Sequence, residues 1–184
     1  MPGAGRSEKY ARPEAERRWL VATLPDLSSA VDARLLEDRY LAGTRLRLRR
    51  ATPLDGGPSL HKLGQKVRPD PADPGLVLHT TMYLTTAEYE RLRVLPGAEI
   101  RKVRHVLISG GRRFALDVFD GRHQGLALME AESNDRDSAR LLTPPPCTDA
   151  EVTGDERFSG GFLAFAPAEA LSALMSLPHR PAER

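Results

Sequence analysis

Three arginines alternate along one short segment, and their spacing is the plainest chemical signal in the chain. Arg45, Arg47 and Arg49 are separated by Leu46 and Leu48. This alternation is typical of a half-buried strand, so the three guanidinium groups share one face at intervals of about 6.5–7 Å. Cations so close together repel one another unless an anion lies among them. The segment therefore indicates a binding site for a polyanion.

Other alternating segments carry charged side chains that would share a face in the same way. The acidic ones are Glu14, Glu16, Asp117, Glu130 and Glu132, and the further basic ones are Arg18, Lys62, Lys66, Lys102 and Arg104. A solvated face would explain any one segment alone, because antiparallel sheets often expose one side to water. Taken together, the segments are sorted by the sign of their charge. We interpret them as a basic wall for a polyanion and an acidic wall for Mg²⁺ or Mn²⁺, ions that prefer oxygen ligands.

The elements that must position these side chains are mostly strands. Alternation predicts strands over 14–22, 34–42, 44–51, 59–67, 76–84, 98–108, 112–120 and 125–133. Helices are expected after Thr85 or Thr86, from a cap at Ser133 or Asn134, and over 167–177. The Ser-Gly-Gly runs at 109–111 and 159–161 are interpreted as turns, because neither has the context of a phosphate-binding loop. So many strands joined by hairpins favour an antiparallel barrel or sandwich.

Length, charge and cysteine content exclude several classes of protein. The chain of 184 residues fits one domain, with 1–11 and 179–184 as flexible tails. Its 27 Lys and Arg against 25 Asp and Glu argue against a nucleic-acid partner bound through a large basic excess. No apolar run approaches the ~20 residues that span a bilayer, and we expect no membrane association. The single Cys147 favours a cytoplasmic protein without a disulfide-linked partner, and a homodimer stays open.

The ordered series of charged motifs resembles the CYTH domains, also called triphosphate tunnel metalloenzymes. The segment EAERRWLV is similar to their opening ExExK signature, and the likeness continues through DRYLAGTRLRLRR, HKLGQKV, AEIRKVRH, FALDVFDG, LALMEAES and PPPCTDAEVTGDERFSGGFLA. The resemblance covers about 12–166. It implies an eight-stranded antiparallel closed barrel with flanking helices, a tunnel that forms one domain over 12–178. It also implies a small triphosphate-containing anion as partner and Mg²⁺ or Mn²⁺ as cofactor.

The resemblance implies a role for each charged residue by its position. Metal ligands would be Glu14, Glu16, Glu130 and Glu132, with Asp117 assisting the metal or the substrate. Phosphate ligands would be Arg45, Arg47, Lys66, Lys102 and Arg104, joined by Arg18, Arg49 and Lys62, and the catalytic candidates are Lys66, Lys102 and Asp117. Two segments depart from the family pattern. Arg18 replaces a lysine and cannot transfer a proton, and His79 and Thr81 stand where related tunnels often carry glutamates.

These observations lead to one main hypothesis and two alternatives. The main hypothesis is a metal-dependent hydrolase that cleaves the terminal phosphate of inorganic triphosphate or of a small organic triphosphate. Arginine forks and lysines would clamp the anion, and the metal would neutralise developing charge and prepare a water. The first alternative is a class IV-type adenylyl cyclase, which converts ATP to cyclic AMP and pyrophosphate. The second is a polyphosphate- or nucleotide-binding module without turnover.

Overall fold

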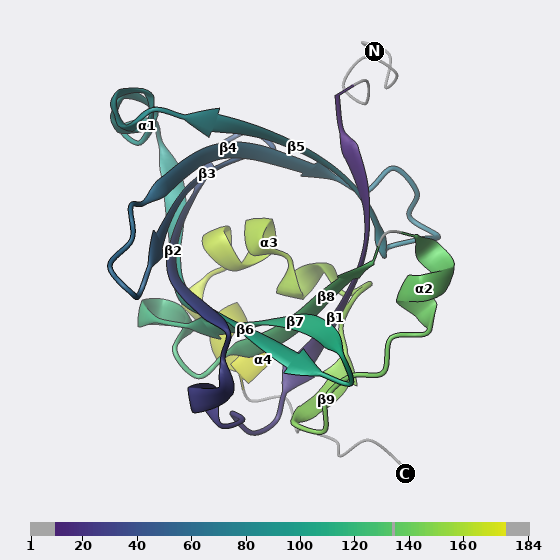
Figure 1. The fold of residues 1–184 in the computed structure, drawn as a ribbon. Helices are drawn as coiled ribbons and strands as arrows, with labels where there is room; N and C mark the ends of the chain where they lie inside the picture. Colours follow the sequence, from purple (N-terminus) through teal and green to yellow (C-terminus); the bar gives the residue numbers. More distant parts are fainter. Residues whose placement is uncertain (1–9, 134, 176–184) are drawn as a thin grey trace.

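A closed antiparallel β-barrel forms the body of the protein, in a computed structural model that describes residues 10–133 and 135–175 (Figure 1). Its eight strands within these residues are β1 (Arg12–Val21), β2 (Asp32–Leu41), β3 (Leu46–Pro53), β4 (Leu60–Val67), β5 (Leu76–Leu84), β6 (Gly97–Ser109), β7 (Arg112–Phe119) and β8 (Ala127–Ser133). They pair in the order β5-β4-β3-β2-β6-β7-β8-β1, and β1 pairs with β5 to close the barrel. The predicted fold class is therefore confirmed. Of the expected tails, 1–9 and 179–184 lie outside the described residues.

Strand β1 closes the barrel by changing partner along one of its edges. Its first residues pair with β5, from Arg12 opposite His79 to Ala15 opposite Leu76. Further along the same edge, a ninth strand, β9 (Thr148–Glu151), pairs with the end of β1. The sequence analysis did not predict β9, because four residues are too short to show an alternating pattern.

Four α-helices within the described residues flank the barrel: α1 (Thr86–Leu92), α2 (Arg136–Arg140), α3 (Gly160–Phe165) and α4 (Ala168–Met175). Helix α1 begins at the predicted cap, where Thr85 and Glu88 form a reciprocal capping box. Helix α2 instead begins at Asp135, whose carboxylate accepts a hydrogen bond from the Ser138 N–H at 2.8 Å. No described helix has the length and apolar character needed to cross a membrane.

The turn predicted at 159–161 is wrong, because those residues start helix α3. The Ser159 hydroxyl accepts a hydrogen bond from the Phe162 N–H at 3.2 Å and caps the helix. The turn predicted at 109–111 is confirmed, and Gly110 and Gly111 there adopt positive φ angles of 54° and 72°. In the end-on view of Figure 1, α3 lies within the outline of the barrel.

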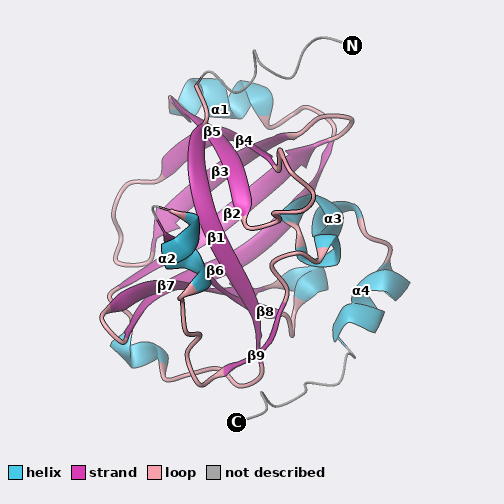
Figure 2. Cartoon of the chain, turned by 90° about the vertical axis from the view of Figure 1, so that its right-hand side faces the viewer, coloured by secondary structure: helices cyan, strands magenta, loops and turns pink. Residues whose placement is uncertain are grey.

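The apolar core lies outside the barrel wall and at one end of it. One cluster covers the outer face of β1, β7 and β8, where Trp19, Met129 and Leu116 are neighbours across the strands. Helix α2 packs on that face (Figure 2). A second cluster joins Ile100 and Leu128 of the barrel to α3 and α4. Because the apolar faces of these strands point outward, the charged side chains at alternate positions point into the barrel.

Candidate functional site

A cavity of about 410 Å³ lies inside the barrel and collects most of the predicted charged residues. The predicted residues that line it are Glu16, Arg18, Arg45, Arg47, Arg49, Lys66, Lys102, Arg104, Glu130 and Glu132. Asp38 and Arg68 also line it, although the sequence analysis did not select them. The lining thus holds eight Lys and Arg against four Asp and Glu, a formal excess of four positive charges. A cavity with this balance of charge favours a polyanion.

Three glutamates from β1 and β8 form the group best suited to a metal ion. Glu14, Glu16 and Glu132 each offer a carboxylate oxygen, and these atoms lie within 4.8 Å of one another. Glu16 and Glu132 stand directly opposite each other in the β1–β8 pairing. The Oε2 atom of Glu14 is buried and accepts no hydrogen bond from any described residue. A hard divalent cation fits such a set of oxygen ligands, one of which accepts no hydrogen bond.

Burial and like charge act together on the third glutamate of this group. Burial raises the pKa of Glu132, and the nearby negative charge of Glu14 raises it further. No ion pair joins Glu132 to another residue in the described part of the chain. A bound cation would relieve this repulsion, so the electrostatics of the three carboxylates agree with their geometry.

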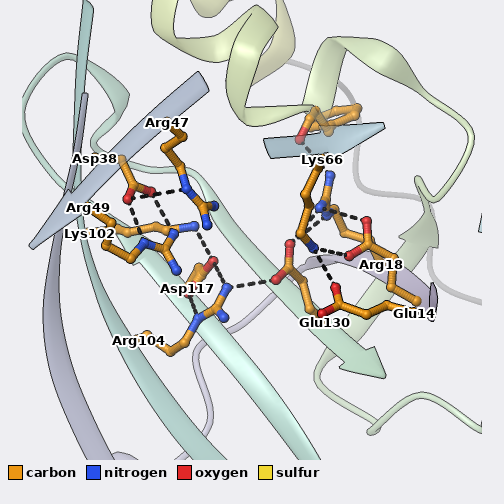
Figure 3. Close-up of polar contacts among 12 residues, drawn as sticks. Glu14, Arg18, Asp38, Arg47, Arg49, Lys66, Lys102, Arg104, Asp117 and Glu130 are labelled. Carbon is orange, nitrogen blue, oxygen red and sulfur yellow. Dashed lines mark hydrogen bonds and ion pairs between the residues drawn. The ribbon is translucent and has the colours of Figure 1, made fainter. Parts of the chain in front are cut away.

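Glu130 was expected among the metal ligands, but its contacts in the structure are with two arginines. Its Oε1 accepts a hydrogen bond from Arg18 Nε at 2.8 Å, and its Oε2 accepts one from Arg104 Nη2 at 2.7 Å (Figure 3). Burial raises the pKa of Glu130, but the charges of Arg18 and Arg104 outweigh burial and hold it well below the usual range. Glu130 therefore stands ionised between the metal group and the basic residues.

Asp117 is completely buried beneath two of the bases and does not line the cavity. It accepts hydrogen bonds from Arg104, Nε to Oδ1 at 2.6 Å and Nη2 to Oδ2 at 2.7 Å, and another from Lys102 Nζ. The structure thus does not place it with the three glutamates, where the acidic wall had been expected. Burial lowers the pKa of Lys102 against the opposing effect of Asp117, so Lys102 holds its proton less firmly than an ordinary lysine does.

The other lysine that was predicted to be catalytic lies beside the three glutamates. Lys66 Nζ donates to Glu16 Oε2 at 2.7 Å and lies 3.4 Å from Glu14 Oε2. Burial lowers the pKa of Lys66, but the charge of Glu16 and its neighbours outweighs burial and leaves it raised. Lys66 is therefore a firmly protonated donor. His79, at a position where a glutamate was expected from the resemblance, also reaches this group: its Nδ1 lies 2.9 Å from Glu14 Oε1.

Two predicted phosphate ligands lie toward the edge of the site. Arg45 precedes β3 and lines the cavity, and no ion pair joins it to another of the described residues. Lys62 is not among the lining residues; its Nζ lies 5.1 Å from the centre of the Tyr83 ring. Arg45 is thus a free cation available to an anion, whereas Lys62 lies next to an exposed aromatic side chain.

Sequence analysis also missed the part of the cavity lining that comes from α3 and the two residues before it. Phe158, Ser159, Gly160, Gly161, Leu163 and Phe165 all line the cavity. A Cβ at Gly160 would lie 1.8 Å from the hydroxyl oxygen of Tyr40, so only glycine fits against that ring without displacing it. Tyr40 lies two residues after Asp38 on β2, and period two places both on the inner face. This spacing was visible in the sequence, but two adjacent acids at 37–38 left it ambiguous which of them points into the barrel.

Acid should destabilise the protein through its buried carboxylates. The pKa values of Glu130, Asp117 and Asp38 are all below their ordinary values, because nearby arginines and lysines outweigh burial. Groups with depressed folded pKa values stabilise above the unfolded value of about 4, and this stability is lost as the pH falls. We expect the free energy of unfolding in urea to fall by about 2 kcal/mol or more between pH 6 and pH 3. Equal stability at both pH values would contradict the ion-pair network.

Comparison with known proteins gives a relative that this chain matches over nearly the relative's whole length. No family model matches the chain. The inorganic triphosphatase of Nitrosomonas europaea is 32% identical over 164 residues, which cover 83% of this chain and 97% of the relative. A crystal structure of an inorganic triphosphatase has a TM-score of 0.56 and 27% identity, covering 84% of this chain and 95% of that one. A protein from Pyrococcus horikoshii shares the fold, with a TM-score of 0.50 and 16% identity over 69% of this chain and 82% of its own. The chain therefore belongs to the family of the Nitrosomonas inorganic triphosphatase.

Proposed function

We propose that this protein is a divalent-metal-dependent triphosphatase of the CYTH type, acting on inorganic triphosphate or a small organic triphosphate. The observation that carries the proposal is the cavity inside the barrel, which has an excess of four positive charges and lies next to three convergent glutamates. The name and the coverage of the Nitrosomonas relative support the same conclusion. The reaction would convert triphosphate and water into pyrophosphate and orthophosphate.

In this proposal Glu14, Glu16 and Glu132 hold Mg²⁺ or Mn²⁺. The ion, when bound, would neutralise charge on the phosphate oxygens and lower the pKa of a water. Their oxygen donors, including a Glu14 Oε2 that accepts no hydrogen bond from a described residue, suit an ion of this type. Lys66 lies next to two of these carboxylates and would donate to a phosphate oxygen close to the ion.

The chain's own bases would bind and orient the anion. Arg45, Arg47 and Arg49 offer guanidinium donors from one face of the β3 segment, and Arg104 offers another across the cavity. Donors held in place by the barrel would stabilise the charge that develops during phosphoryl transfer. Arg18 keeps its charge and cannot exchange a proton. Lys102, whose pKa is lowered by burial, is the group we assign to hold or move a proton, with Asp117 fixing its Nζ.

Phosphate release from tripolyphosphate tests this function. We expect the purified protein with Mg²⁺ or Mn²⁺ to form orthophosphate and pyrophosphate in equal amounts, and to form neither in excess EDTA. ATP in the same assay distinguishes the alternatives: cyclic AMP with pyrophosphate indicates a cyclase. Folded protein that binds tripolyphosphate and turns over neither compound with either metal would contradict the proposal and favour a binding module.

A further inference from the structure

Asp38 is a buried acid in the cavity that none of the roles above uses. It lies on the inner face of β2 and is 2% exposed. Its carboxylate accepts two hydrogen bonds from Arg49, Nε to Oδ1 at 2.6 Å and Nη2 to Oδ2 at 2.7 Å. Arg47 approaches the same carboxylate, with Nε 3.8 Å from Oδ1 (Figure 3). One buried anion therefore contacts two of the three arginines in the row.

The strand register explains why Asp38 reaches both arginines. Asp38 stands opposite Arg49 in the β2–β3 pairing, and Arg47 stands two residues away on the same face of β3. Two guanidinium groups on one strand face repel each other, and a carboxylate between them offsets that repulsion. A bidentate pair also fixes the plane of the guanidinium group, which a single point charge does not.

The pairing leaves both arginines able to bind a ligand. Arg49 uses Nε and one Nη2 hydrogen on Asp38, so its remaining N–H donors are free for phosphate oxygens. Arg47 also lines the cavity, and its Nε makes no hydrogen bond to Asp38 or to any other described residue. Burial raises the pKa of Asp38, but the charges of Arg49 and Arg47 outweigh burial and hold it well below the usual range. The carboxylate is therefore ionised at any working pH.

We infer that Asp38 is a positioning residue for phosphate binding, which holds Arg49 and Arg47 with their free N–H groups directed at the anion. The inference rests on the proposed triphosphatase function. For a variant that neutralises Asp38, this role and a purely electrostatic role predict opposite changes in affinity for the anion. Removing a negative charge from the cavity would strengthen anion binding if Asp38 acted only through its charge. Loss of positioning would weaken binding instead.

The same two strands provide a matched control on their outer face. Glu37 pairs with Arg50 through a hydrogen bond from Nε to Oε2 at 2.6 Å, and this pair stands next to Asp38 and Arg49 in the register. Their side chains are 31% and 38% exposed, and neither residue lines the cavity. Glu37→Gln therefore removes an ion pair between the same strands without touching the site.

The experiment compares Asp38→Asn with Glu37→Gln in tripolyphosphate hydrolysis with Mg²⁺. We expect Asp38→Asn to raise KM about tenfold or more. The loss of a hydrogen bond to a charged group typically weakens binding by at least about that factor. Its kcat, corrected for the folded fraction, should change less than about threefold. Glu37→Gln should leave both constants unchanged. Calorimetric titration of tripolyphosphate in EDTA should show the same order of affinities without turnover.

A second variant keeps the inference testable if Asp38→Asn fails to fold. Arg49→Lys keeps the positive charge but loses the bidentate fork, so we expect a similar rise in KM. The KM of the double variant should be no higher than the higher KM of the two single variants, because both substitutions remove the same interaction between Asp38 and Arg49. An unchanged or lower KM in either single variant, in a protein whose wild type turns over tripolyphosphate, would overturn the inference alone. A wild type without binding or turnover would instead overturn the proposed function and this inference with it.

Discussion

Glu132→Gln is expected to abolish metal-dependent turnover and, without metal, to stabilise the protein. Loss of a residue that only supports a metal ligand costs about 10–100-fold in affinity or activity, so loss of a ligand should cost at least about 100-fold. Glu132 also stands opposite Glu16 and close to Glu14, and it has no cationic partner in an ion pair among the described residues. Removing its charge relieves repulsion worth up to about 1 kcal/mol.

Thermal unfolding with and without Mg²⁺ or Mn²⁺ measures the stability effect alongside the phosphate-release assay. The wild type should be stabilised by metal in a concentration-dependent way, because an ion that binds only the folded state shifts the equilibrium. Glu132→Gln should have a higher melting temperature without metal and show little response to it. Glu169→Gln, an exposed acid on α4, is the matched control and should behave as the wild type does. A variant with wild-type activity and a wild-type metal response would exclude Glu132 as a ligand.

Arg104→Met is expected to produce the largest loss of stability in the barrel. Arg104 bonds to both oxygens of the fully buried Asp117 and to Glu130. Its removal leaves two buried carboxylates short of their compensating charge, a change that typically costs about 3–5 kcal/mol. Activity should fall too, since Arg104 is one of the proposed phosphate ligands and also helps to fix Asp117.

The pH dependence of that loss identifies its cause. In the wild type, Arg104 contributes to the depressed pKa values of Asp117 and Glu130, so its contribution is complete above about pH 4 and shrinks in acid. The difference in unfolding free energy between wild type and variant should therefore be smaller at pH 3 than at pH 7. Arg101→Met on the same strand removes an exposed pair with Asp120 and should cost less than about 1 kcal/mol. Equal costs for the two variants would mean that Asp117 does not depend on Arg104.

Alternation in the sequence was enough to predict the strands and the charged face of each, but it left a barrel and a sandwich open; the closed barrel was expected from the resemblance to CYTH domains. Period two assigns every second residue to one face without any knowledge of partners. Arg47, Arg49 and Lys102 could therefore be placed in a common cavity before any strand pairing was known, and the structure puts them there. The capping box of α1 was predictable for a similar reason, because Thr85 and Glu88 interact within one turn.

The pairing of acids with bases could not be predicted in the same way, since it depends on register between strands far apart in sequence. Sorting by sign suggested separate acidic and basic walls, whereas the structure pairs Asp117 with Arg104 and Glu130 with Arg18. Asp38 was not predicted as a site residue, because it lies between charged neighbours and the sequence does not show which face of the strand it occupies. Helix α3 was missed because its two leading glycines are typical of a turn, and the packing of Gly160 against Tyr40 shows only in the folded structure.

The most direct test of the proposed site is a ³¹P NMR time course of tripolyphosphate with Mg²⁺ and either the wild-type protein or Glu132→Gln. We expect the wild type to replace the tripolyphosphate signals with one pyrophosphate and one orthophosphate for each molecule consumed, and Glu132→Gln to leave them unchanged. An unchanged spectrum with folded wild-type protein and either metal, or equal turnover by Glu132→Gln, would contradict a triphosphatase site built on the three glutamates.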